Sequence, residues 1–131
     1  MIHASVQIKV LEDAGVDLIA AETMINIEET LAALDAAASV SSLPVMCTMT
    51  VEADGSIFSG GNAVEAAIAL EGAGAVAVGI NCSVGPDQLV SVVRGKLWIS
   101  EKVKESRRYM ITESVSAVSA ARRCARRRQS K

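Results

Sequence analysis

The sequence predicts an α/β fold whose parallel sheet forms part of a (β/α)₈ barrel. Three short apolar runs rich in β-branched residues recur about every 30 residues, the length of a strand with its returning helix, and a helical pattern follows each run. A complete barrel needs roughly 250 residues, so this 131-residue chain has room for three to four βα units. A doubly wound sheet is the plainer alternative.

The three predicted strands are nearly uninterrupted apolar segments. Such runs are typical of parallel strands that are buried on both faces. We expect strands near residues 16–22, 43–49 and 75–81.

Polar side chains follow each predicted strand. Glu22 and Thr23 end the first run, Thr48 to Thr50 end the second, and Asn81 and Cys82 end the third. The carboxyl ends of parallel strands share one edge, so we expect these residues on the same rim. Together they could bind a small zwitterion or a metal ion. The alternative is that they only cap loops.

Helical patterns connect the strands. An apolar stripe predicts a helix from about residue 27, through Ile27, Leu31, Leu34 and Ala38. Asn62 precedes a second helix as a candidate N-cap, with Glu65 three residues later in a variant of the capping box. Gly72 and Gly74 end that helix, and Pro86 suits the first position of a third.

The composition indicates a globular domain with a thin core. Half of the residues are hydrophobic, the mean hydropathy is +0.34, and only Phe58, Trp98 and Tyr109 are aromatic. No apolar run reaches the length of a membrane span, and residues 1–15 lack the features of a secretory signal. Cys47, Cys82 and Cys124 form an odd set without a CxxC pair, which argues against a disulfide framework. We therefore expect a cytoplasmic protein without a membrane partner.

Charge divides the chain into two segments. Through residue 93 twelve acidic residues accompany one basic residue, whereas from Arg94 onward twelve basic residues accompany three acidic ones. We therefore predict a partial barrel over residues 1–93 and a divergent basic tail over 94–131 that is either helical or disordered. Tyr109 is the one aromatic near the Arg-rich end of the tail, and no nucleic-acid-binding motif accompanies the charges, so nucleic acid is not the expected partner.

Three separated motifs resemble the homocysteine S-methyltransferase domain, especially the one that begins cobalamin-dependent methionine synthases. They are "GVDLIAAET", "LPVMCTMTVEADGSIFSGG" and "GAVAVGINCSVGPDQL", in the family's order and at its intervals. The resemblance covers residues 4 to about 93. Its most specific element is Gly79-Ile80-Asn81-Cys82 followed by Gly85-Pro86.

The resemblance implies an enzyme that transfers a methyl group to the homocysteine thiolate to form methionine. In this family zinc is bound by three cysteines on a (β/α)₈ barrel, and Cys82 matches the first of them. Glu22 is then expected to pair with the substrate's ammonium group, and Asn81 to orient substrate or backbone beside the metal. The implied methyl donor is one such as methylcobalamin.

The sequence departs from the family pattern in its second half. The other two zinc ligands are adjacent cysteines in a Gly-Gly-Cys-Cys-Gly type segment, and no such pair occurs here. Cys47 has no matching ligand role in the family and is expected in the core. Cys124 lies in the Arg-rich segment "ARRCARRR" and does not match either of the two missing zinc ligands. The family strand that follows the last helix is not recognisable either.

These departures favour a fragment, with a shifted reading frame or a fusion after residue 93, over a natural basic tail. We expect this chain to be incomplete and inactive on its own. The alternative is a non-catalytic half-barrel binding or assembly protein, whose basic tail recruits an acidic partner. In either case the uncovered sheet edges of a half barrel predict self-association.

Overall fold

The sheet is open, parallel and ordered along the chain. The computed structural model describes residues 2–82, 84–95 and 109–111. Strands β1 (Ile19–Met24), β2 (Val45–Met49), β3 (Ala77–Ile80) and β4 (Tyr109–Ile111) lie in the order β1-β2-β3-β4, and every neighbouring pair is parallel. The first three strands form three βα units, which confirms the predicted α/β fold with part of a barrel.

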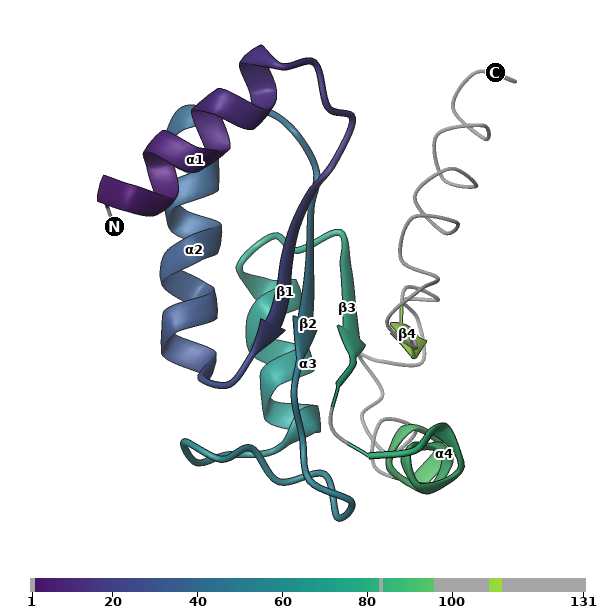
Figure 1. Ribbon diagram of the computed structural model, residues 1–131. Helices are drawn as coiled ribbons and strands as arrows, with labels where there is room; N and C mark the ends of the chain where they lie inside the picture. The colour runs from purple at the N-terminus through teal and green to yellow at the C-terminus, as the bar shows by residue number, and fades with distance from the viewer. Residues whose placement is uncertain (1, 83, 96–108, 112–131) are drawn as a thin grey trace.

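Helices cover one face of the strands (Figure 1). Helix α1 (Ile2–Asp13) packs on α2 (Ile27–Val40), α2 lies against β1 and β2, and α3 (Ala63–Gly72) lies against β2 and β3. Helix α4 (Pro86–Gly95) follows β3 and is drawn beyond the arrowheads of the strands, at their carboxyl ends.

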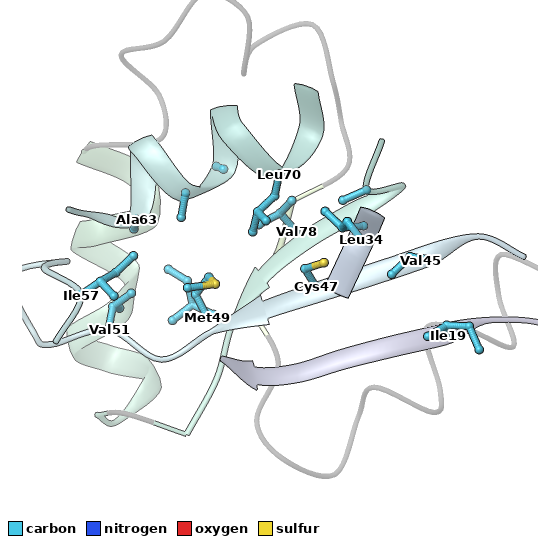
Figure 2. Close-up of a cluster of buried hydrophobic side chains, with 14 of the residues drawn as sticks. Ile19, Leu34, Val45, Cys47, Met49, Val51, Ile57, Ala63, Leu70 and Val78 are labelled. Atoms are coloured by element: carbon cyan, nitrogen blue, oxygen red, sulfur yellow. The ribbon is translucent and has the colours of Figure 1, made fainter. Parts of the chain in front are cut away.

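The core lies between the strands and these helices (Figure 2). Cys47, Met49 and Val78 point from the sheet toward Leu34 of α2 and Leu70 of α3, and these side chains are at most 6% exposed. Because Cys47 is completely buried, the prediction that it is a core residue is confirmed. No aromatic side chain belongs to the described core, and Phe58 is 86% exposed, so the core is built from small and aliphatic residues as expected.

Helix α2 differs from the predicted stripe. Its buried positions are Thr30, Leu34, Ala36 and Ala37, whereas Ile27 and Leu31 are only partly buried and Ala38 is exposed. The helix packs on α1 as well as on the sheet, so its buried face is turned toward Ala37 rather than Ala38.

The ends of α3 and the start of α4 agree with the sequence. Asn62 Oδ1 accepts hydrogen bonds from the amides of Val64 and Glu65, while Glu65 Oε2 accepts one from the Asn62 amide. This is the complete capping box, and α3 ends at Gly72 ahead of Gly74, whose φ of +101° favours glycine. Helix α4 begins at Pro86, as predicted.

Helix α1 was not predicted, because its apolar residues do not form one continuous stripe. Ile8 is buried, but Val6, Val10 and Leu11 are exposed. Glu12 links the end of α1 to the end of α2, since its carboxylate accepts a hydrogen bond from the hydroxyl of Ser41, the C-cap of α2, at 2.9 Å. It also accepts one from Lys9 at 3.2 Å. These bonds, Ser41 first, hold the pKa of Glu12 below its ordinary value.

Strand β4 corrects one expectation from the sequence. No strand was recognised after the last helix, yet Tyr109–Ile111 pairs in parallel with β3. Three residues are too few for periodicity to reveal a strand, and this one is assigned by its pairing with β3. Arg94 and Gly95, the first residues of the predicted tail, end helix α4. Residues 96–108 and 112–131 lie outside the described residues, so their helical or disordered character remains a prediction.

No helix in the described part of the chain combines the length and apolar character needed to cross a lipid bilayer.

Candidate functional site

The end of β1 is a bulge. Ala21 pairs with Cys47 and Met24 pairs with Met49, so Glu22 and Thr23 together stand opposite Thr48. The extra residue is accommodated at Thr23, whose φ of 62° lies in the left-handed region that β-branched residues rarely adopt. The Thr48 hydroxyl accepts a 3.0 Å hydrogen bond from the Thr23 amide, and so replaces a partner that the regular strand ladder would have supplied.

The end of β3 lies beside this bulge. The Asn81 amide donates to the carbonyl oxygen of Met49 at 3.1 Å, which extends the pairing of β2 and β3 by one residue. Cys82 then leaves the strand with a φ of 56° and an exposed thiol. Thr23 and Cys82 are the two non-glycine residues with positive φ in the described parts of the chain.

Side chains connect the two strand ends. Asn81 Nδ2 donates to Glu22 Oε1 at 3.2 Å and to Thr23 Oγ1 at 3.0 Å. The Thr23 hydroxyl in turn donates to Cys82 Sγ over a long 3.9 Å contact. We call Glu22, Thr23, Asn81 and Cys82 the rim cluster. The expectation that these residues meet at one edge of the sheet is confirmed.

Asn81 is the buried member of the rim cluster. Its side chain is 1% exposed, whereas Glu22, Thr23 and Cys82 are exposed. Within the described residues, Asn81 Oδ1 is a buried oxygen without a hydrogen-bond partner. A buried polar atom usually has a partner, because leaving it unpaired costs free energy. The rim cluster therefore combines a free acceptor, an exposed carboxylate and an exposed thiol.

The strand end of β2 contributes support rather than an exposed group. Thr48 is 2% exposed and holds the Thr23 backbone. The Thr50 hydroxyl donates to the Asn81 carbonyl oxygen at 3.4 Å, and the Thr50 amide donates to the Met24 carbonyl oxygen at 2.8 Å. Both threonines lie where the sequence predicted, and both act on the backbone of the neighbouring strand ends.

The described residues do not fit the three-thiolate zinc site of the resemblance. No group of three His, Cys, Asp or Glu side chains lies close enough together among them to hold a metal ion. Cys47 is sealed in the core, where burial raises the pKa of its thiol to about 11. Cys124 lies outside the described residues, and the sequence has no adjacent cysteine pair. Cys82 is thus the single exposed thiol that the described structure places at the rim.

Sequence reasoning placed Thr23 at a strand end but did not identify its conformation. The bulge depends on how β1 pairs with β2, and a Thr in a left-handed conformation leaves no sequence signal comparable to glycine. His3, the one histidine of the sequence, is exposed on α1.

Comparison with known proteins identifies the family. A search of curated proteins found no match. A model of the homocysteine S-methyltransferase family matches residues 3–125, which is most of the chain and extends beyond the residues 4–93 that carried the resemblance. Homocysteine is the substrate of this family. The chain therefore belongs to the homocysteine S-methyltransferase family.

Proposed function

We propose that this chain is a fragment of a zinc-dependent homocysteine S-methyltransferase of the methionine synthase type, and that its rim cluster is the part that binds homocysteine. The observation that carries this proposal is the bridge from Asn81 Nδ2 to Glu22 Oε1 at 3.2 Å, beside the exposed Cys82 thiol. The bridge orients one carboxylate oxygen and leaves the other available to a ligand. In the cytoplasm, the expected compartment, Cys82 would remain reduced.

Glu22 is the group suited to the ammonium of homocysteine. It is exposed, and among the described residues no salt bridge holds its carboxylate. An ammonium group donating to this carboxylate would form a charge-assisted hydrogen bond, one of the stronger polar contacts in proteins. Asn81 then acts as the residue that fixes the direction of the carboxylate, which is the substrate-orienting role expected for it.

The homocysteine sulfur must be a thiolate to attack a methyl group, and a free thiol with a pKa of about 8.5 is mostly protonated at neutral pH. Cys82 is the candidate for one zinc ligand, by the match to the family motif. Because the described residues supply one exposed thiol in place of three, we propose that this chain does not retain zinc on its own. Methylcobalamin is the proposed methyl donor, by resemblance alone.

Catalysis by the chain as given is therefore expected to be absent. We propose that it is a fragment, whose remaining zinc ligands would come from a segment carrying the adjacent cysteine pair. Zinc content after dialysis and methionine formation from homocysteine and methylcobalamin should both be near background, in the chain and in Cys82→Ser alike. Stoichiometric zinc with turnover that depends on Cys82 would contradict the fragment proposal.

Homocysteine binding is tested separately from catalysis. Isothermal titration calorimetry of the chain with homocysteine should give weak binding, and Glu22→Gln should weaken it by roughly tenfold or more, since one charge-assisted bond is lost. Glu28→Gln is the matched control, because Glu28 is exposed in the first turn of α2. Equal affinities for the chain and Glu22→Gln would contradict the assignment of the ammonium to Glu22.

Self-association is the proposed state of the purified chain. In the described sheet β1 pairs only with β2 and leaves its other edge open, and such edges pair with other chains. Val6 and Val10 are 58% and 62% exposed on α1. Light scattering should report oligomers, and a compact monomer that persists in high salt would contradict this proposal.

A further inference from the structure

Thr23 has no part in the proposed ammonium site, yet its hydroxyl contacts two other members of the rim cluster. Its hydroxyl accepts from Asn81 Nδ2 at 3.0 Å and donates to Cys82 Sγ at 3.9 Å. A hydroxyl has one proton and two lone pairs, and the proton cannot point toward Asn81 Nδ2, which donates to one of the lone pairs. The proton is therefore left to point away from Asn81, and Cys82 Sγ is the acceptor that lies within reach.

The backbone of Thr23 is also constrained. The residue lies in a bulge with a φ of 62°, a conformation that costs a β-branched residue free energy and persists where its surroundings impose it. Thr48 imposes it here, because its buried hydroxyl accepts from the Thr23 amide at 3.0 Å. The bulge inserts one extra residue into β1, and this insertion places Thr23 beside the end of β3.

We propose that Thr23 is a positioning residue for Cys82. The bulge brings the Thr23 hydroxyl to the end of β3, Asn81 orients it, and the hydroxyl selects one rotamer of the Cys82 side chain. Cys82, itself left-handed at a φ of 56° and exposed, would otherwise be free to rotate into solvent. This inference rests on the proposed function only where Cys82 serves as a zinc ligand. The positioning of its side chain by Thr23 requires no bound ligand.

The test measures the Cys82 side chain directly in the full chain. Couplings between Hα and the two Hβ protons of Cys82, measured by NMR, report its χ1 angle. A single staggered rotamer gives either one large and one small coupling or two small ones, whereas rotation averages both couplings to intermediate values. The chain should show the couplings of a single rotamer, Thr23→Val should show averaged ones, and Thr23→Ser should restore the single-rotamer values. Thr23→Ala provides the same loss of the hydroxyl should the valine variant fail to fold.

The outcomes separate positioning from a purely structural role. A structural role for Thr23 would lower stability in Thr23→Val without changing the Cys82 couplings, and that result would overturn the proposal. Averaged couplings in the unchanged chain would overturn it as well. Neither result depends on homocysteine or metal, so the proposed function can fail or succeed independently in the calorimetric experiment.

Discussion

The start of α3 and the rim cluster differ in whether their polar groups have hydrogen-bond partners and in whether their backbone is strained. At α3, Asn62 and Glu65 satisfy each other's backbone amides within a span of four residues. At the rim, Thr23 and Cys82 adopt left-handed conformations and Asn81 Oδ1 has no partner in the described structure. Satisfied groups stabilise the fold, whereas strained and unpaired ones are typical of sites that meet a ligand. The scaffold and the rim should therefore respond differently to chemical modification and to substitution.

The largest expected difference is between the thiols of the two regions. Burial raises the pKa of Cys47 to about 11, so at pH 8 only about one thousandth of it is thiolate, and the core also blocks access. Alkylation at pH 8, in a Cys124→Ser background and followed by mass spectrometry, should modify Cys82 at least a hundredfold faster. Below pH 11 the slow rate of Cys47 should rise about tenfold per pH unit. Similar rates for both thiols would contradict the placement of Cys47 in the core.

The scaffold should respond strongly to a cavity. Leu70 of α3 is completely buried, so Leu70→Ala should lower the free energy of unfolding by about 2 to 5 kcal/mol. Ile68→Ala on the same helix is the control, since Ile68 is 41% exposed and should cost much less. Urea denaturation measures both. Equal losses would mean that α3 does not pack as described.

Backbone strain at the rim should reverse the usual effect of glycine. At Thr23, glycine should be more stable than alanine by about 1 kcal/mol, because only alanine is strained in a left-handed conformation. Ala20 also lies in β1, but without a positive φ, and Ala20→Gly should lose about 0.5 to 1 kcal/mol. Urea denaturation of Thr23→Gly, Thr23→Ala and Ala20→Gly should therefore give opposite signs at the two positions. The same sign at both would remove the evidence for strain in the bulge.

The smallest effect concerns the helix cap. Asn62→Ala removes the acceptor for the amides of Val64 and Glu65 and should cost about 1 kcal/mol in urea denaturation. Asn62→Ser retains an oxygen at the cap and should recover most of that loss. An unchanged free energy of unfolding in Asn62→Ala would show that the capping box does not stabilise the scaffold.

The same contrast explains how much the sequence could predict. The capping box, Pro86 at the start of α4 and the burial of Cys47 depend on neighbouring residues or on a strand's apolar pattern, and all three were predicted. The meeting of Glu22 with Asn81 followed from the general rule that parallel strands share a carboxyl edge.

The remaining features depend on contacts between distant segments. The bulge at Thr23 exists only in the pairing of β1 with β2, and no local pattern marks it. Strand β4 has three residues and is assigned through its pairing with β3. The turn of the buried face of α2 toward Ala37 follows from packing on α1, a helix whose own apolar residues were too dispersed to predict.

We propose that the rim cluster, and not another surface, binds homocysteine. An NMR titration of the isotope-labelled chain with homocysteine can locate the bound ligand. We expect the amide signals of the rim cluster to shift together and saturably, while those of Asn62 and Glu65 at the start of α3 do not shift. Glu22→Gln should greatly reduce the shifts. Saturable shifts confined to other residues, or rim shifts unchanged in Glu22→Gln, would contradict this proposal.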